Sequence, residues 1–475
     1  MTSPKPSTPA DVCRLSAAEL AAGFANHTLD PRVVTEQCLE RIEATRPLCA
    51  FAYVDAEGAR AAAAASAARW AAGAPMSRLD GVPVTQKDLQ HVQGWPTRRG
   101  SAATDDAPQP VDSPSSARLR EAGCVMLGKT TTPDHGWKAV GDSPVTGIAR
   151  NPWNPAHTPG GSSAGAAIAA AVGAGALHVG TDGGGSIRIP AAFSGIVGFK
   201  PTWGRAAMWP PSPFAIVSHL GPMTRTVADA ALMMSVLAGL DARDANQIPL
   251  RLMDEAHLDQ GLSGLSIALS LTLGQMPVDR EIAAAVTAAA ELAAAAGAVV
   301  EAVDPPLPPD IQRAWLTFWN GGAARLADTL PADRLALLDP GLGASIEAGR
   351  RLSARDWLAA EAVRMASVAA MSAFHTRHQL LITPAVGVPA LPAGALLARP
   401  TDQHWTDWAG FAWPFNLTRQ PAVVIPCGLT AAGLPIGVQV LGPMYADAEV
   451  LGAAAALERL IGFAARHPLP LGIGC

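Results

Sequence analysis

The segment from Thr158 to Arg188 constrains the fold of this chain more than any other stretch. An apolar run from Ala164 to Val179 is flanked by two loops rich in glycine and serine, Thr158-Pro-Gly-Gly-Ser-Ser-Ala-Gly and Gly180-Thr-Asp-Gly-Gly-Gly-Ser-Ile-Arg. The run is too short and too weakly hydrophobic to span a bilayer, so it predicts a buried helix. Glycines let backbone N–H groups approach a ligand, and a Gly-Gly-Gly-Ser run can bind an anion. Either loop alone is consistent with a flexible turn, but two such loops around one buried helix favour a functional site.

Neither loop matches a nucleotide-binding motif. The chain has no G-x-x-x-x-G-K-[ST] there, and Gly173-Ala174-Gly175 lacks the third glycine of a dinucleotide fingerprint. Residues 161–165 formally match G-x-S-x-G, which would make Ser163 the nucleophile of an α/β-hydrolase. That nucleophile follows a strand, whereas residues 151–161 carry three prolines and are unsuited to a central strand. The sequence therefore disfavours Ser163 as a nucleophile.

Charge and composition exclude several classes of protein. The 475 residues have a formal net charge of -5, with 35 Lys plus Arg against 40 Asp plus Glu, so nucleic acid is not an expected partner. The apolar fraction of 49% suffices for a large core. Residues 1–15 lack the apolar segment of a secretory signal. We therefore expect a cytoplasmic protein without a membrane partner, whose residues 1–12 form a flexible N-terminal arm.

The cysteines and histidines indicate neither a disulfide framework nor a metal site. None of the six cysteines belongs to a C-x-x-C pair, so ordinary reduced thiols are expected. His375 and His378 have a ligand-like spacing, but the glutamate of H-E-x-x-H is missing. We expect no metal and no cofactor.

The remaining patterns predict an α/β fold: one large domain over residues 13–475, with a mixed, largely parallel central sheet covered by helices on both faces. Ser16 with Glu19 forms a capping box, and Asp30-Pro31 is typical of a helix start. A strand, a helix and a strand over residues 265–271, 281–296 and 298–303 predict a parallel β-α-β unit. Residues 305–378 are expected to form a helical insertion or cap, and residues 75–230 the catalytic core. Further expected elements are a helix over 56–72, strands over 81–88, 122–127, 195–199, 380–383, 422–426 and 437–441, and a closing helix over 447–465.

Three segments, in this order, resemble the amidase signature family. They are a strand Gly81-Val-Pro-Val-x-x-Lys87-Asp, the loop Gly160-Gly-Ser-Ser163, and Gly184-Gly-Ser-Ile-Arg188. The likeness continues through residues 198–202, 221–229, 415–418 and 433–439, and it covers nearly the whole chain from about residue 10. Ala164 stands where most members of that family have glycine, and a small residue still fits there.

The resemblance implies a serine hydrolase that cleaves C–N bonds other than peptide bonds. Ser186 would be the acylated nucleophile, Ser162 a bridging serine preceded by a cis peptide bond, and Lys87 the buried base. A lysine acts as a base only when it is neutral, and burial on an apolar strand lowers its pKa accordingly. The backbone N–H groups of Gly183, Gly184, Gly185 and Ser186 would hold the oxyanion. Asp182 and Arg188 are expected to form an internal ion pair that braces the loop.

Aromatic residues suggest the kind of substrate. Trp137, Trp209, Phe214 and Trp319 occur in regions that line the substrate funnel of similar proteins, which indicates a bulky, apolar or aryl small-molecule amide. Core packing is the other interpretation, since Trp315 and Trp319 are four residues apart on a predicted helix. Esters, ureas and carbamates (a urethanase activity) are also within the family's range. The alternative function is the glutaminase subunit of a tRNA-dependent amidotransferase, and we expect a monomer or homodimer.

Overall fold

The computed structural model describes residues 11–214, 216–248, 255–396, 405–467 and 470. Residues 1–10 of the expected N-terminal arm lie outside the described residues. At the end of that arm, Val12–Arg14 (η1) forms a short 3-10 helix, and Val12 itself is buried. The packed part of the chain therefore includes the end of the expected arm.

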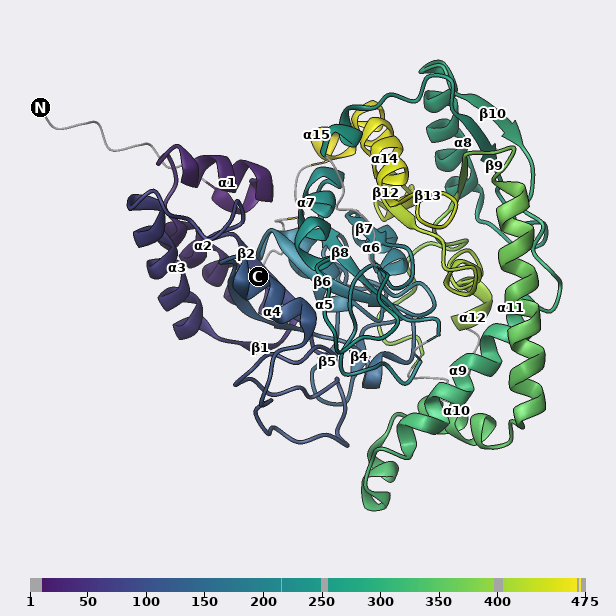
Figure 1. Ribbon diagram of the computed structural model, residues 1–475, viewed down its shortest axis with the longest axis horizontal. Coiled ribbons are helices and arrows are strands. Elements are labelled where there is room, and N and C mark those ends of the chain that lie inside the picture. The colour runs from purple at the N-terminus through teal and green to yellow at the C-terminus, as the bar shows by residue number, and fades with distance from the viewer. Residues whose placement is uncertain (1–10, 215, 249–254, 397–404, 468–469, 471–475) are drawn as a thin grey trace, which may run out of the picture.

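A single twisted sheet runs through the centre of the molecule (Figure 1). Within the described residues it has 11 strands. Several of them, including β2, β3, β6 and β13, are buried along their whole length, as is expected of strands that are covered on both faces. In spatial order the strands are β1 (Phe51–Val54), β3 (Val125–Thr130), β2 (Pro83–Lys87), β6 (Leu177–Asp182), β8 (His219–Thr224), β7 (Val197–Lys200), β12 (Ala422–Leu429), β13 (Pro435–Leu441), β11 (Leu380–Pro384), β9 (Ser266–Leu269) and β10 (Val299–Ala302). A separate hairpin pairs β4 (Asp142–Ser143) with β5 (Gly147–Ile148).

The mixed character of the sheet is confirmed, but parallel pairing is less extensive than the sequence indicated. Strands β3, β2 and β6 pair in parallel, as do β11, β9 and β10. The other pairings in the described sheet are antiparallel. Short returns, such as the turn between β12 and β13, place consecutive strands side by side in opposite directions. In the sequence, only the unit of β9, α8 (Arg280–Ala295) and β10 showed a pattern that predicts parallel pairing.

Helices cover both faces of this sheet, and several begin at the residues expected. Ser16 and Glu19 form the capping box of α1, and Asp30 with Pro31 begins α2. The helices are α1 (Ala17–Ala25), α2 (Pro31–Ala44), α3 (Ala56–Ala71), α4 (Pro114–Glu121), α5 (Ala164–Val172), α6 (Arg188–Ser194), α7 (Val227–Leu237), α8 (Arg280–Ala295), α9 (Ile311–Ala327), α10 (Pro340–Arg350), α11 (Ala354–Phe374), α12 (Trp405–Trp408), α13 (Pro414–Leu417), α14 (Asp447–Ile461) and α15 (Phe463–Arg466).

The apolar run from Ala164 to Val179 is not one helix, contrary to the prediction. Helix α5 ends at Val172, where Gly173 takes a left-handed conformation (φ 75°), and Leu177 to Val179 belong to strand β6. Gly175 also has a positive φ, of 114°. Because glycine adopts these angles without a steric penalty, the chain reverses and enters the centre of the sheet. The two Gly/Ser loops are therefore separated by a helix and a strand.

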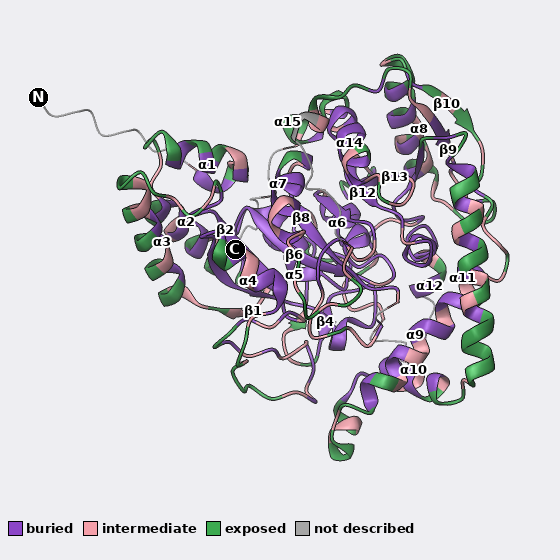
Figure 2. Cartoon of the chain, in the orientation of Figure 1, coloured by how far each residue is buried: buried purple, intermediate pink, exposed green. Residues whose placement is uncertain are grey.

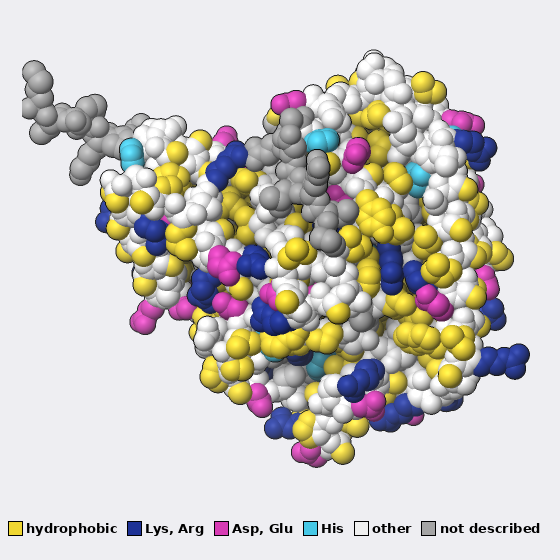
Figure 3. Space-filling view, viewed as in Figure 1, with side chains coloured by type: hydrophobic (Ala, Val, Ile, Leu, Met, Phe, Trp, Pro, Cys, Tyr) yellow, Lys and Arg dark blue, Asp and Glu magenta, His cyan; other side chains and the backbone are white. Residues whose placement is uncertain are grey.

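Residues 311–374 form a helical layer at one side of the molecule. Helices α9 and α10 pack together, and α11 runs beside them (Figure 1). Most of α11 is exposed along its outer face, whereas the central sheet is buried (Figure 2). None of the described helices is both long and apolar enough to cross a membrane. On the face drawn in Figure 3, basic side chains are scattered among acidic ones.

Gly165 allows α5 to start directly against β3. Its N–H donates to the carbonyl of Thr131 at 3.1 Å, and a Cβ at this position would collide with the carbonyl oxygen of Ala50 and the amide nitrogen of Thr131. We expect Gly165→Ala to lower the free energy of unfolding by about 2–3 kcal/mol, since the overlapping atoms belong to backbone. Urea unfolding followed by circular dichroism measures this change.

Gly343→Ala provides the matched control. Gly343 lies in α10, and no atom lies within 4 Å of the position that an added methyl group would take. The same substitution should raise the free energy of unfolding there by about 0.5–1 kcal/mol, because alanine is the better helix former. Equal effects in the two variants would contradict the proposed close approach at Gly165.

Candidate active site

Lys87 is the last residue of β2, and its side chain is fully buried. Its Nζ donates to three hydroxyl groups, Ser162 Oγ at 2.7 Å, Ser163 Oγ at 3.0 Å and Thr181 Oγ1 at 3.0 Å. All three partners are neutral. The lysine nitrogen is therefore held at the junction of both Gly/Ser loops by dipoles alone.

Burial of this amine lowers its pKa from the ordinary 10.5 to about 7, while the negative charge of Asp182 acts in the opposite direction. Removing the ammonium from water disfavours its charged form, and hydroxyl groups compensate for only part of the lost hydration. Near neutral pH a large fraction of Lys87 is thus an uncharged amine. Such an amine can accept a proton from a neighbouring hydroxyl.

The two loops meet at their serines. The peptide bond between Gly161 and Ser162 is cis, as expected, and the Ser163 N–H donates to the carbonyl of Ser186 at 3.1 Å. Ser162 and Ser186 both line one cavity, and Ser163 is not among the residues that line it. The Ser163 hydroxyl instead donates to the carbonyl of Thr181 at 3.2 Å. Ser163 also lacks a strand before it, so it does not form a hydrolase-type nucleophile elbow.

The expected ion pair between Asp182 and Arg188 is present, and both side chains are fully buried. Arg188 Nε donates to Asp182 Oδ2 at 2.9 Å, and Nη2 donates to Oδ1 at 3.0 Å. Burial alone would raise the pKa of Asp182, but the charge and hydrogen bonds of Arg188 hold it well below its usual range. This bidentate pair closes the turn that carries Ser186.

The expected role of Gly185 as an oxyanion donor is not supported. Its N–H donates to Asp182 Oδ1 at 2.7 Å. A carboxylate is a strong acceptor, so this N–H serves to fix the loop. Gly183, Gly184 and Ser186 remain as candidates for an oxyanion hole.

Sequence reasoning missed two residues that complete the ion pair. Asn416 in α13 donates to the backbone carbonyl of Asp182 at 2.9 Å and to its Oδ1 at 2.8 Å. Gln439 in β13 accepts from Arg188 Nη1 at 2.8 Å. Each is a polar residue inside an otherwise apolar, buried segment, and this contrast was the signal available in the sequence.

The cavity beside the serines has a volume of about 80 Å³. Of the four predicted pocket residues, Phe214 and Trp319 line it, and their rings stack with centroids 4.2 Å apart. Its lining comprises Leu89, Gln90, Arg99, His135, Gly136, Ser162, Thr181, Gly183, Ser186, Met208, Pro210, Pro211, Ser212, Pro213, Phe214, Ser218, Trp319 and Leu326.

Trp137 and Trp209 do not line this cavity, so their assignment to the pocket is corrected. Trp137 is buried in the hydrophobic core. Trp209 lies edge-on to the ring of His91, and its own ring faces the guanidinium of Arg243 at 4.7 Å. Trp315 stacks on Trp319, and both rings belong to the buried core, but only Trp319 also lines the cavity.

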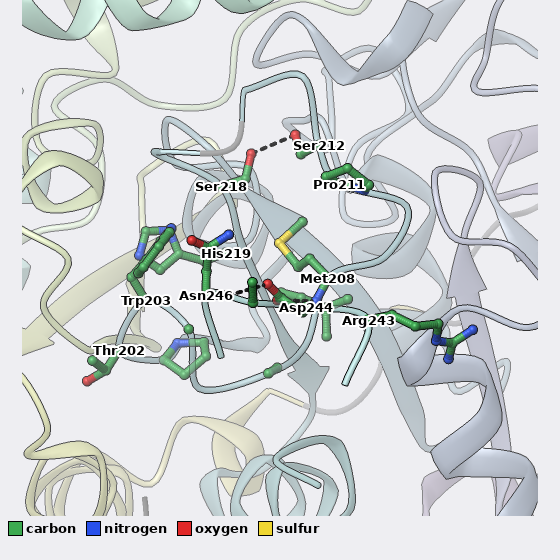
Figure 4. Close-up of a pocket in the computed structure, with 15 residues that line it drawn as sticks. Thr202, Trp203, Met208, Pro211, Ser212, Ser218, His219, Arg243, Asp244 and Asn246 are labelled. Carbon is green, nitrogen blue, oxygen red and sulfur yellow. Dashed lines mark hydrogen bonds between the residues drawn. The ribbon is translucent and has the colours of Figure 1, made fainter. Parts of the chain in front are cut away.

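A second cavity of about 240 Å³ adjoins the first (Figure 4). Met208, Pro211, Ser212 and Ser218 line both, and the hydroxyls of Ser212 and Ser218 are 2.9 Å apart. Figure 4 shows these residues with His219 on the strand that follows. The catalytic cavity thus shares part of its wall with a larger cavity.

The histidine pair that resembled metal ligands has another role. His375 Nδ1 lies 2.8 Å from the carbonyl of His378, and its Nε2 lies 2.7 Å from the amide nitrogen of Gln420. Across the described part of the chain, no group of three or more potential ligands gathers. These hydrogen bonds join the end of α11 to the segment before β12.

Comparison with known proteins identifies the family of this chain. The family model described as Amidase matches residues 33–451. This chain belongs to the amidase signature family. An acylamidase of Rhodococcus erythropolis is 33% identical over 471 residues, covering 96% of this chain and 97% of the relative. The A-type subunit of a glutamyl-tRNA(Gln) amidotransferase of Anaeromyxobacter sp. (strain K) is 35% identical over 505 residues, covering 98% and 99%.

Solved structures of the same family are similar across their whole length. A bacterial aryl acylamidase matches with a TM-score of 0.91 at 30% identity, covering 97% of this chain and 99% of that one. A 6-aminohexanoate cyclic dimer hydrolase matches with a TM-score of 0.89 at 26% identity, also covering 97% and 99%. The single-domain α/β fold is therefore that of the amidase signature enzymes, and the protein is an amide hydrolase.

The lowered pKa of Lys87 predicts how the free energy of unfolding depends on pH. Between about pH 7 and the ordinary pKa of 10.5, the unfolded chain binds a proton at Lys87 that the folded protein has lost. The free energy of unfolding should therefore rise with pH in this window, by about 1.4 kcal/mol per pH unit from this group, and level off below pH 7. Lys87→Met lacks this contribution. Urea unfolding of both proteins at pH 6, 7, 8 and 9 measures the difference, and parallel pH profiles would show an unperturbed lysine.

Proposed function

We propose that this protein hydrolyses the C–N bond of aryl or apolar amides through an acyl-enzyme on Ser186. The observation that carries the proposal is the contact between Lys87 Nζ and Ser162 Oγ at 2.7 Å, inside a buried site that Ser186 also lines. A serine hydroxyl becomes nucleophilic when a base removes its proton, and the neutral lysine is that base.

We propose that these three residues form a proton relay. Lys87 Nζ accepts a proton from Ser162 Oγ, which accepts one from Ser186 Oγ as that oxygen attacks the substrate carbonyl carbon. The C–N bond then breaks, and the relay returns a proton to the leaving nitrogen. Water attacks the resulting ester, activated by the same relay, and releases the acid and free Ser186.

Backbone donors stabilise the charge that develops during this attack. The N–H groups of Gly183, Gly184 and Ser186 are the proposed oxyanion hole, each contributing about 3 kcal/mol by analogy with other acyl transferases. Asp182 and Arg188 act indirectly, since their ion pair fixes the turn that presents these groups.

The aromatic wall supports an aryl or bulky apolar group in the substrate. Phe214 and Trp319 offer stacked rings to the cavity, and aromatic rings bind flat apolar groups through packing and burial. The likeness to an aryl acylamidase supports the same class. Aryl carbamates share the planar group and the C–N bond, so a urethanase activity is included in the proposal.

A glutaminase is the second candidate, because the A-type subunits of tRNA-dependent amidotransferases are as similar in sequence as the acylamidase. Hydrolysis of free glutamine, measured as released ammonia, separates it from the first. Faster turnover of glutamine than of any anilide or aryl carbamate would favour it.

A covalent probe tests the nucleophile. A fluorophosphonate should label Ser186, with the modified peptide identified by mass spectrometry, and Ser186→Ala should not be labelled. Ser162→Ala and Lys87→Ala should slow labelling by at least about 100-fold, because the relay is broken. Ser212→Ala changes another hydroxyl of the cavity and should be labelled like the original protein. Modification at Ser163 would contradict the assignment.

A substitution in the aromatic wall tests the substrate class. Trp319→Leu should lower kcat/KM for acetanilides by about 10–30-fold, because their ring loses its packing partner. The kcat/KM for acetamide should change less than about threefold, since acetamide has no ring. Trp357→Leu makes the same change on the outer part of α11 and should leave both values unaltered. An equal loss on both substrates after Trp319→Leu would argue against a ring-binding wall.

A further inference from the structure

Arg99 places a guanidinium group at the catalytic cavity. The described residues that line the cavity include no Asp, Glu or Lys beside it. The aromatic wall lies elsewhere in the same cavity, at Phe214 and Trp319. The proposed hydrolase site therefore combines an apolar wall with one guanidinium group.

The hydrogen-bond partners of this guanidinium are uncharged. Nη1 donates to the carbonyl of Leu89 at 3.5 Å, and Nη2 lies 3.1 Å from His91 Nε2. Burial, together with the charges of Arg99 and Lys129, lowers the pKa of His91 to about 4, so this imidazole is neutral and accepts the hydrogen bond. No carboxylate forms an ion pair with Arg99 among the described residues.

Asp88, the acidic residue that acts electrostatically on Arg99, already forms an ion pair with Lys129. Asp88 influences Arg99 electrostatically, but its Oδ1 lies 2.9 Å from Lys129 Nζ, and both side chains are buried. Asp88 thus directly pairs with Lys129, and Asp134, another buried acid of this region, contacts His135 and not Arg99. Burial lowers the pKa of Arg99, yet a guanidinium stays protonated in proteins.

The backbone holds Arg99 in place. Its φ is 54°, in the left-handed region that non-glycine residues rarely adopt, and its carbonyl accepts the N–H of His135 at 2.7 Å. His135 itself lines the cavity. Such strain is retained where the surrounding structure enforces it, commonly at binding sites.

We propose that Arg99 binds a carboxylate group of the substrate, so that this enzyme acts on amides that carry both an apolar or aryl group and a carboxylate. This inference rests on the proposed hydrolase function and specifies its substrate class. The planar fork of arginine matches a carboxylate through two parallel hydrogen bonds. A bound carboxylate would supply the negative charge that the cavity lining lacks.

Matched substrates test the proposal and locate the carboxylate. Succinic mono-4-nitroanilide and butyric 4-nitroanilide differ by a carboxylate on the acyl side, and N-acetyl-4-aminobenzoate and 4-methylacetanilide differ by one on the leaving side. The enzyme should prefer the charged member of at least one pair by about tenfold or more in kcat/KM. Arg99→Gln should lower that charged-to-neutral ratio by at least about 30-fold, mainly through KM, and Arg99→Lys should restore part of it.

The neighbouring arginine is the matched control. Arg98 forms an ion pair with Asp106, which is largely exposed, so Arg98→Gln should keep the charged-to-neutral ratio. An original enzyme without preference for either charged substrate would overturn the proposal, as would an Arg99→Gln variant with an unchanged ratio. Fluorophosphonate labelling of Ser186 in the original enzyme is measured in parallel. Normal labelling with no carboxylate preference refutes only the role of Arg99, whereas absent labelling refutes the hydrolase mechanism itself.

Discussion

The buried charge of Asp182 is the constraint on which the site depends. A carboxylate with no access to water must be compensated at every oxygen, and here Arg188, Asn416 and the N–H groups of Gly185 and Ile187 provide that compensation. These partners come from the loop after β6, from α6 and from α13. Satisfying one charge therefore fixes the turn that presents Ser186 against elements distant in sequence.

The lysines show how partner choice sets the behaviour of a buried amine. Lys87, Lys129, Lys138 and Lys200 are all buried, while Lys5 lies outside the described residues. For Lys138, burial favours a lower pKa, but Asp142 and Asp339 are in direct contact and the net pKa is raised. Lys87 contacts hydroxyls only, and its pKa falls to about 7. A lowered pKa is not unique to Lys87, because burial also lowers the pKa of Lys200, which contacts backbone carbonyls. What distinguishes Lys87 is that its partners include a serine hydroxyl of the cavity.

Local signals predicted local structure well. The capping box at Ser16, the proline start of α2 and the β9–α8–β10 unit each depend on neighbouring residues, and each is present. The Ala164–Val179 run failed because periodicity could not distinguish a buried helix from a buried strand, and the two glycines that divide it were read as part of an apolar stretch.

Features of the site that depend on contacts between distant residues could not be predicted from the sequence. The motif resemblance placed Lys87, Ser162 and Ser186 in one site, and Lys87 does contact Ser162 there. It could not reveal that the Gly185 N–H donates to Asp182, or that Trp137 does not line the cavity. Arg99 was equally hidden, because arginines are numerous in this chain.

The proposed role of Arg99 also bears on the chemistry. The negative charge of a substrate carboxylate would repel the oxyanion that forms at the carbonyl. A guanidinium paired with that carboxylate removes most of this repulsion. Substrate binding and acylation would then rely on the same positive charge.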